Sequence, residues 1–126
     1  MTYPPPLHEL ETEVMEELWA RGEGTVREVL EALNGRGGAQ RAYTTILTVM
    51  QRLHAKDVLR RERRGRHDAY LPALTRDEYA QARAGAEFGA LVSEYGDVAL
   101  AHFARHMAQL DPKRRAQIRR LADGGD

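Results

Sequence analysis

Apolar residues in the first half of the chain recur at intervals of three and four, with acidic and polar residues between them. This spacing places them on one face of a helix and leaves the other face to solvent. Three such stripes occur: Leu7, Leu10, Val14, Leu18 and Trp19; Val26, Val29, Leu30 and Leu33; and Ile46, Val49, Met50 and Leu53. We therefore predict helices over residues 7 to about 22, 26–34 and about 43–56, the second opened by a capping box of Thr25 and Glu28.

The pattern becomes extended after the third predicted helix. Residues 58–63 and 68–71 form two short runs on either side of Arg64-Gly65-Arg66-His67, whose glycine suits a turn. This arrangement predicts a β-hairpin rich in arginine, ended by Pro72. The glycine-rich segment 35–40, before the third helix, is expected to be a mobile linker.

Helical spacing returns in the last third of the chain. Thr75 and Glu78 make a second capping box at the start of a long helix, which Gly96 should end. Asp97 is expected to cap a fifth helix, and Asp111-Pro112 is typical of the N-cap and first position of a sixth.

The two ends of the chain carry no such periodicity. Residues 4–6 are three prolines, and residues 123–126 are short and polar, so both segments are expected to be unstructured.

The order of three helices and a hairpin predicts a mainly α fold with a small β-hairpin wing, that is, a winged helix-turn-helix domain over residues 7–73. The three C-terminal helices span fewer than about 50 residues, which is too few to enclose a core of their own. We expect residues 75–122 to form a helical dimerisation domain that pairs with a second copy. The large apolar residues assigned to that interface are Phe88, Leu91, Val92, Phe103, Met107 and Leu110.

Charge is balanced overall but unevenly distributed. The 126 residues contain 19 Lys and Arg and 19 Asp and Glu, so the formal net charge is zero. Residues 1–34 nevertheless hold two basic and eight acidic side chains, whereas residues 35–72 hold nine basic and three acidic ones. A cationic middle segment favours a polyanionic partner such as DNA, and the short length excludes a large enzyme.

Several classes of protein are excluded by what the sequence lacks. It contains no cysteine, so disulfide frameworks and thiolate metal sites are excluded. Residues 1–10 do not resemble a secretory signal, and no apolar run approaches the 18 residues of a membrane span, so a soluble cytoplasmic protein is expected.

Polar residues on the third predicted helix are the candidates for base contacts. Threonine methyl groups suit the thymine methyl, glutamine can pair with adenine, and arginine prefers guanine. These positions could equally be ordinary solvated residues. Tyr43, in the first turn, could either pack or contact a phosphate. The hairpin arginines nearest the turn could reach phosphates, although a basic edge strand can also serve to prevent edge-to-edge pairing. The candidate DNA-binding residues are Arg41, Tyr43, Thr44, Thr45, Thr48, Gln51, Arg52, Arg63, Arg64 and Arg66.

No catalytic chemistry is indicated. His102 and His106 stand four residues apart, a spacing that two metal ligands on a helix could use, but the residue after His102 is Phe103 rather than the glutamate of zinc peptidases. Surface histidines are the simpler interpretation. Because no nucleophile elbow or phosphate-binding glycine loop occurs either, we expect no enzyme activity, no metal and no cofactor.

The middle of the chain resembles a known family. The run Ala42-Tyr43-Thr44-Thr45-Ile46-Leu47-Thr48-Val49-Met50-Gln51-Arg52-Leu53, then Lys56, Arg64-Gly65-Arg66 and Tyr70-Leu71-Pro72, is similar to the signature of the BlaI/MecI/CopY family of penicillinase-type winged-helix repressors. The resemblance extends upstream to about residue 10, and downstream it is looser. Asp57 stands where the family usually has glycine after the lysine.

The resemblance implies a homodimeric transcriptional repressor that binds pseudo-palindromic operators with TACA and TGTA halves through the third helix. In antibiotic-responsive members, a membrane sensor metalloprotease leads to cleavage of the repressor in its dimerisation domain. The corresponding bond here is His102-Phe103, where the best-known members have Asn before Phe. The copper-responsive mechanism needs a Cys-x-Cys pair, which this chain lacks. An alternative is a winged-helix sensor with a small-molecule or metal effector in the C-terminal domain.

Overall fold

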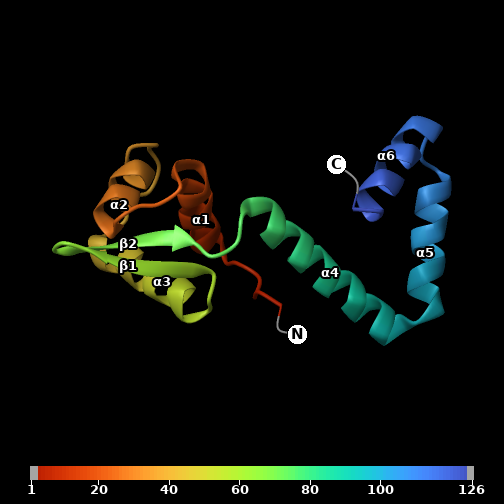
Figure 1. Ribbon diagram of the computed structural model, residues 1–126, viewed down its shortest axis with the longest axis horizontal. Helices are drawn as coiled ribbons and strands as arrows, with labels where there is room; N and C mark the ends of the chain where they lie inside the picture. The colour runs from red at the N-terminus through yellow and green to blue at the C-terminus, as the bar shows by residue number, and fades with distance from the viewer. Residues whose placement is uncertain (1–2, 125–126) are drawn as a thin grey trace. The chain divides into compact units, whose positions relative to one another are not determined.

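The computed structural model describes residues 3–124, in which six helices and one β-hairpin follow one another (Figure 1). The backbone divides into two compact units, one ending at Gly85 and the other beginning at Ala86. Within residues 3–124, no helix combines the length and the apolar character needed to cross a bilayer.

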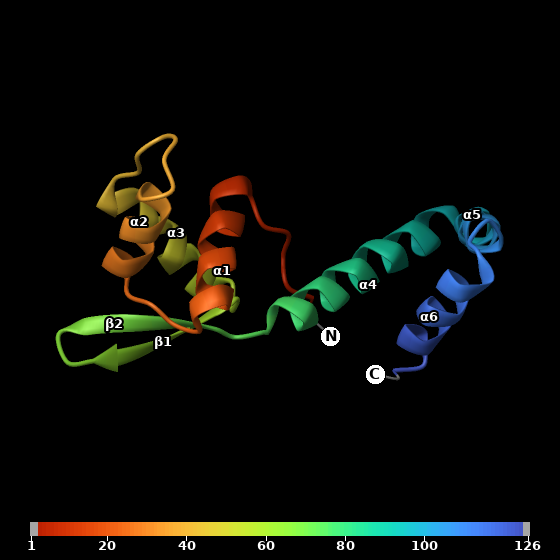
Figure 2. The same cartoon turned by 90° about the horizontal axis from the view of Figure 1, so that it is seen from above.

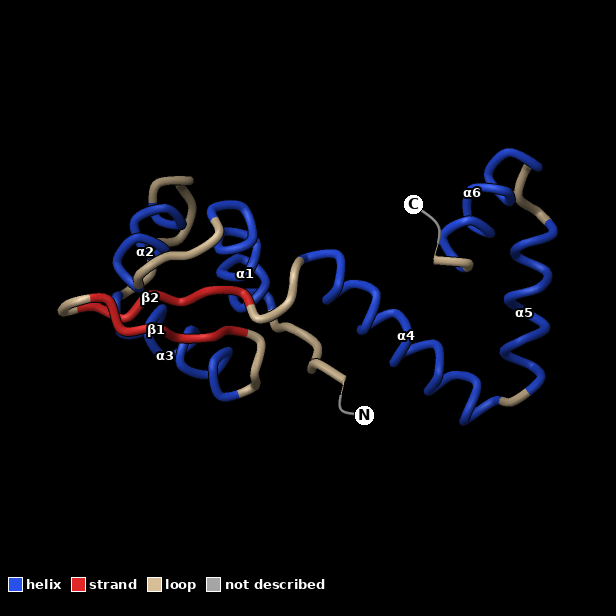
Figure 3. The backbone as a smooth tube through the Cα atoms, in the orientation of Figure 1, coloured by secondary structure: helices blue, strands red, loops and turns tan. Residues whose placement is uncertain are grey.

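The N-terminal unit is the predicted winged helix. Its helices α1 (Glu9–Arg21), α2 (Val26–Asn34) and α3 (Tyr43–Ala55) are followed by strands β1 (Leu59–Arg64) and β2 (His67–Pro72). The two strands pair antiparallel (Figure 3), and the three helices lie on one side of them (Figure 2). The apolar stripes predicted from the sequence meet in one core, where each fully buried aliphatic side chain contributes about 1.5–3 kcal/mol. The core residues are Val14, Met15, Leu18, Val26, Val29, Leu33, Ile46, Val49, Met50, Leu53, Val58, Leu59 and Tyr70.

Helix ends agree with the sequence pattern to within one or two residues. The first helix begins at Glu9 rather than residue 7 because His8 has extended backbone and is the N-cap. The capping box before α2 is present, since the Glu28 backbone N–H donates to Thr25 Oγ1 at 3.1 Å and the Thr25 backbone N–H donates to Glu28 Oε1 at 2.8 Å. The third helix ends at Ala55, one residue earlier than predicted.

The hairpin turn is tighter than predicted. Arg64 pairs with His67, so the loop has two residues instead of the four expected from the sequence. Gly65, with φ 64°, occupies the first loop position, where a left-handed residue matches the twist of the flanking strands and allows pairing to continue to the tip. The base of the hairpin is also anchored, because Gly24 and Tyr70 exchange two backbone hydrogen bonds of 3.0 and 2.9 Å.

The N-terminal prolines are structured, so the prediction of an unstructured end was wrong there. The hydroxyl of Tyr79 donates to the Pro5 carbonyl at 2.6 Å, and Arg83 Nη1 donates to the Pro4 carbonyl at 3.0 Å. Prolines lack an N–H and cannot join a ladder, but their carbonyls remain free to accept hydrogen bonds. We call residues 4–6 the proline strap. At the other end of the chain, the backbone N–H groups of Asp123 and Gly124 donate to carbonyls of the last helix at 3.1 Å, so these two residues are structured as well, and residues 125 and 126 lie outside the described residues.

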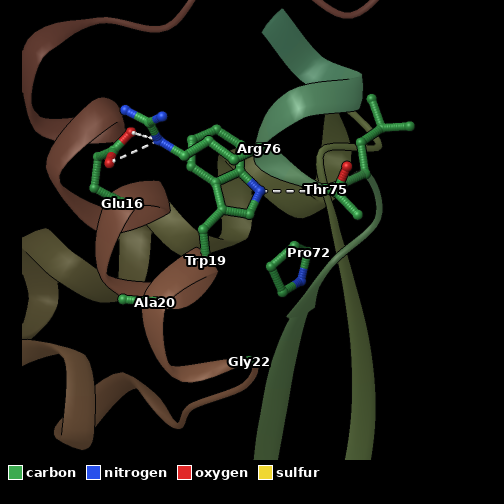
Figure 4. Close-up of a pocket in the computed structure, with 8 residues that line it drawn as sticks. Glu16, Trp19, Ala20, Gly22, Pro72, Thr75 and Arg76 are labelled. Carbon is green, nitrogen blue, oxygen red and sulfur yellow. Dashed lines mark hydrogen bonds and ion pairs between the residues drawn. The ribbon is translucent and has the colours of Figure 1, made fainter. Parts of the chain in front are cut away.

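The start of the fourth helix, α4 (Arg76–Tyr95), is attached to α1. Trp19 Nε1 donates to the Leu74 carbonyl at 2.9 Å, and Arg76 Nε donates to both carboxylate oxygens of Glu16 at 2.9 and 3.1 Å (Figure 4). The Trp19 ring also lies 5.7 Å from the ring of Tyr79, measured between their centres. These contacts explain why the compact N-terminal unit extends to Gly85, beyond the boundary near residue 73 expected from the sequence.

The segment between α2 and α3 is held at several points. Asn34 binds the backbone of Arg41 in both directions, accepting from its N–H at 2.8 Å and donating to its carbonyl at 3.1 Å. Gln40 Nε2 donates to the Asn34 carbonyl, and Arg36 pairs with Glu17 of α1.

The C-terminal unit contains the rest of α4, α5 (Asp97–Ala108) and α6 (Pro112–Ala122). Asp111 caps α6 as predicted, with its side chain accepting from the Arg114 backbone N–H at 2.8 Å. The prediction that Asp97 caps α5 was wrong, because Asp97 is the first helical residue. The N-cap is Gly96, whose positive φ of 59° glycine adopts without strain. No residue of these three helices is buried in the described part of the chain.

Candidate nucleic-acid interface

The third helix exposes a polar face. Its apolar residues Ile46, Val49, Met50 and Leu53 are buried, and at about 100° per residue the opposite side is centred on Thr44, Thr48 and Gln51, all exposed. Thr45 and Arg52 are exposed along one edge of this face. The five polar residues predicted from the sequence therefore share one continuous surface, with side chains whose donors, acceptors and methyl groups match base edges.

Each edge of this polar face is bordered by a groove. On the Thr45 and Arg52 edge, α3 meets the start of α1 at His8 and Glu11. On the other edge, Tyr43 and Leu47 line a groove whose remaining walls come from the first turns of α2 and from the wing; we call it the wing groove.

Acidic residues of α1 neutralise cations that the sequence places in the basic segment. Lys56 Nζ donates to Glu11 at 2.9 Å, and Arg41 Nη2 donates to Glu13 at 3.2 Å. Glu17 pairs with both Arg36 and Arg21. The predicted contact residue Arg41 is therefore already paired within the chain.

Glu11 is 4% exposed and remains charged. Burial alone would raise the pKa of its carboxyl group, but hydrogen bonds from the His8 backbone N–H at 2.9 Å and from Lys56 outweigh burial, so the pKa lies below its ordinary value. The charged pair ties the start of α1 to the end of α3.

Two of the three wing arginines predicted to reach phosphates are also paired. Arg63 lies 3.5 Å from Asp68, and Arg64 binds Glu62 at 2.8 Å and Glu23 of the α1–α2 turn. The hydrogen bond that the Arg64 guanidinium donates to Glu62 raises the pKa of Arg64, and the one that it donates to Glu23 adds to this effect. Arg66, in the turn itself, has no carboxylate within 4 Å in residues 3–124.

One cation near α3 was not among the sequence candidates. The guanidinium of Arg27, on α2, lies 5.3 Å from the centre of the Tyr43 ring, a cation–π geometry. The only available signal was that Arg27 is one of two basic residues in the otherwise acidic segment 1–34. Tyr43 is 41% exposed, so part of its side chain remains open to solvent.

The residues assigned to dimerisation lie in the C-terminal unit. Phe88, Leu91 and Phe103 are exposed, at 38%, 49% and 50%, and Val92, Met107 and Leu110 are half-buried. The rings of Phe88 and Phe103 pack against each other with centres 5.3 Å apart. His102, at the predicted cleavage site, is exposed in the middle of α5. Among the described residues, no group of three His, Asp or Glu side chains could hold a metal ion.

Comparison with known proteins gives consistent matches. The penicillinase repressor family matches residues 7–124. Two relatives described as transcriptional regulator BlaI, from two strains of Mycobacterium tuberculosis, are each 40% identical over 117 residues, 87% of this chain and 81% of the relative.

Two solved BlaI structures each match 63% of the chain. The solution structure of the DNA-binding domain of the repressor BlaI has a TM-score of 0.54 at 28% identity and covers 63% of this chain and 94% of its own. The monomeric form of Bacillus licheniformis BlaI in complex with the blaP half-operator has a TM-score of 0.52 at 28% identity, with the same coverage. With a family match over almost its whole length and a winged-helix fold, this chain belongs to the penicillinase repressor family of transcriptional repressors.

Proposed function

We propose that this protein represses transcription by binding, as a homodimer, a pseudo-palindromic operator of the TACA/TGTA type. The observation that carries the proposal is the exposed polar face of α3, with five candidate base-contacting side chains on a rigid, well-packed helix. The relative whose solved structure contains a blaP half-operator supports the same mode of binding here. A bound dimer would block RNA polymerase, and the protein itself performs no chemistry.

The chemistry of the α3 face suits an A·T-rich half-site. The methyl groups of Thr44, Thr45 and Thr48 can contact thymine methyls, and Gln51 can pair with adenine through two hydrogen bonds. Arg52, at the edge of the face, is the candidate for guanine. Tyr43 and the wing residues would bind the flanking phosphates, with Arg66 the wing arginine that has no intramolecular pair.

The C-terminal unit is proposed to form the dimer. Large apolar side chains are exposed there on both α4 and α5, among them Phe88, Leu91, Leu100 and Phe103, and exposed apolar residues in such number are typical of an interaction surface. Two recognition helices held in one dimer gain affinity through effective concentration, on the order of 10²- to 10⁴-fold over a single helix.

Release from the operator is proposed to follow cleavage of the His102-Phe103 bond, prompted by a membrane sensor metalloprotease. Both residues are exposed, although the bond lies within α5, so the helix must open locally before a protease can bind it. Cleavage would separate the recognition helices from the dimer core and remove the gain from effective concentration. Mass spectrometry of the repressor recovered from induced cells would locate the cut; an intact chain that leaves the operator would favour an effector-binding mechanism instead.

Fluorescence anisotropy on two duplexes of equal length tests the proposed function. One duplex carries a TACA/TGTA dyad and the other the same bases scrambled. We expect much tighter binding to the dyad at physiological salt, with an affinity that falls steeply as salt rises, because arginines displace counterions from phosphates. Equal affinity for the two duplexes would contradict sequence-specific repression.

A further inference from the structure

The wing groove combines cationic and aromatic side chains beside the polar face of α3. Arg27 comes from α2, Tyr43 from α3, and Arg66 from the turn of the wing. We propose that Arg27, held over the Tyr43 ring, is a further DNA-binding residue that contacts a backbone phosphate at this edge of α3. The inference rests on the proposed function, since it assumes that α3 lies against a duplex.

The charges of the groove leave Arg27 available to an anion. The Glu28 carboxylate is turned toward the Thr25 backbone N–H, and Asp68 is paired with Arg63. Glu31 also lines the groove. Within residues 3–124, no carboxylate lies within 4 Å of the Arg27 guanidinium. An exposed arginine without an acidic partner is suited to phosphate, because its charge has not been neutralised within the fold.

The contact with Tyr43 orients the guanidinium of Arg27 and leaves its N–H donors available for other hydrogen bonds. A cation–π contact uses the flat face of the group, whereas the N–H donors point outward from its edge. The planar fork of arginine can then donate two parallel hydrogen bonds to a phosphate. Tyr43 thus acts as a positioning residue for Arg27, in addition to any contact that its own hydroxyl makes.

The place of Arg27 along the edge of α3 fits a phosphate better than a base. When a recognition helix enters the major groove, its centre faces base edges and its flanks face the sugar–phosphate strands. Arg27 reaches this surface from α2 and meets α3 at Tyr43, on the flank, next to Thr44 on the central face. A phosphate contact there would fix the position of α3 in the major groove of the DNA without distinguishing one base sequence from another.

The test compares Arg27→Ala with Arg27→Lys by anisotropy on the dyad and the scrambled duplex over a series of salt concentrations. Loss of one phosphate contact should reduce the slope of log affinity against log salt by about 0.9 for each recognition helix bound. At 0.15 M salt this corresponds to about a five-fold loss of affinity per helix. Arg27→Ala should weaken both duplexes by the same factor, and Arg27→Lys should retain the slope because it retains the charge.

Two further variants test the role of Tyr43. Each is combined with Arg27→Ala. In the Tyr43→Phe background, which keeps the ring, Arg27→Ala should weaken DNA binding as much as it does in the wild type. In the Tyr43→Leu background Arg27→Ala should weaken binding much less, because the guanidinium is no longer oriented. Arg76→Ala is the matched control for loss of one charge in the same unit, since Arg76 is paired with Glu16 and lies at the start of α4. Thermal denaturation by circular dichroism verifies that each variant is folded.

The outcomes separate the inference from the proposed function. If the wild type prefers the dyad and Arg27→Ala leaves both affinity and slope unchanged, the phosphate contact is disproved while repression stands. A loss confined to the dyad would mean that Arg27 contacts a base, and would also overturn the inference. If the wild type binds both duplexes equally but Arg27→Ala lowers the slope, the phosphate contact holds and sequence-specific repression fails. No binding to either duplex would overturn both.

Discussion

Asp57 occupies a backbone conformation that most side chains avoid. It is the only residue other than glycine with positive φ in the described part of the chain, at 64°. It follows the last turn of α3, and its N–H donates to the His54 carbonyl at 3.0 Å. Aspartate tolerates the left-handed region better than most residues because its short polar side chain can bond locally. The substitution of aspartate for the usual glycine of the family therefore keeps the exit from α3 intact.

Replacing Asp57 with residues of different backbone freedom tests this account. Asp57→Ala should lower the free energy of unfolding by about 1 kcal/mol, because alanine adopts positive φ at a cost of about 1–2 kcal/mol. Asp57→Gly should leave stability equal or higher. Urea denaturation monitored by circular dichroism measures both, and equal stability of the alanine and glycine variants would show that the conformation carries no strain.

Arg52 on α3 and Arg66 in the wing, which both lack a carboxylate within 4 Å in residues 3–124, should differ in their contribution to DNA binding. Arg52→Ala should lose about 1–3 kcal/mol of discrimination between dyad and scrambled duplex if it contacts a base, whereas Arg66→Ala should weaken both duplexes alike. Anisotropy titrations of the two variants against both duplexes distinguish these outcomes. A uniform loss in Arg52→Ala would reassign that residue to the phosphate backbone.

At the scale of elements, charge pairing organises the N-terminal unit. The acidic first third and the basic middle of the chain fold against each other through Glu11–Lys56, Glu13–Arg41 and Glu23–Arg64. The positive block in the sequence therefore overstates the charge available to DNA. A smaller set of arginines has no carboxylate within 4 Å in residues 3–124, and this set includes Arg27, Arg52 and Arg66.

The ion pair between Glu11 of α1 and Lys56 at the end of α3 should make the free energy of unfolding depend on pH in the acid range. The pKa of Glu11 is lowered in the folded state, so its stabilisation is complete above the unfolded value, near 4.5, and is lost as pH falls through the folded value. The free energy of unfolding, measured in urea between pH 7 and pH 3, should fall less steeply in Glu11→Gln than in wild type. Glu9→Gln, an exposed charge removal on the same helix, is the control; an identical pH profile in Glu11→Gln would contradict the assignment.

The attachment of α4 to the proline strap also makes a measurable contribution. Tyr79→Phe removes the hydroxyl that donates to Pro5 and should lower the free energy of unfolding by about 1 kcal/mol. Tyr95→Phe, at an exposed position of the same helix, should have no effect. Chemical denaturation of the two variants beside wild type provides the comparison. Equal stability of Tyr79→Phe and wild type would mean that water bonds the Pro5 carbonyl as well as the tyrosine hydroxyl does.

At the scale of the whole molecule, the boundary between compact units lies inside α4. A fragment of residues 1–85 keeps the contacts of Trp19, Tyr79 and Arg83, whereas residues 1–73 lose them. We expect the longer fragment to melt at a higher temperature, and both to be monomeric while the full chain is dimeric, as measured by analytical ultracentrifugation. A dimeric fragment, or a full-length monomer at micromolar concentration, would place the dimer interface elsewhere.

The elements of this fold could be predicted because their signals are local. The capping box of Thr25 and the turn at Gly65 involve neighbours in the chain, and the apolar stripe of α3 is visible in thirteen consecutive residues. The pairing of Glu23 with Arg64 and the stacking of Arg27 on Tyr43 join residues far apart in sequence, which no periodicity encodes. The basic hairpin was predicted correctly, but the pairing of Arg63 with Asp68 was not, because these residues face each other only in the register that the two-residue turn sets.

The proline strap has a consequence for comparing this protein with its relatives. Tyr79 and Arg83 bind carbonyl oxygens of Pro4 and Pro5, and every residue type has a carbonyl. Any extended segment of suitable length could therefore take the place of the prolines with no shared residue. A sequence alignment would therefore show only the two residues of α4, a tyrosine and an arginine one helical turn apart. Related repressors can thus preserve the contact while the segment before α1 changes beyond recognition.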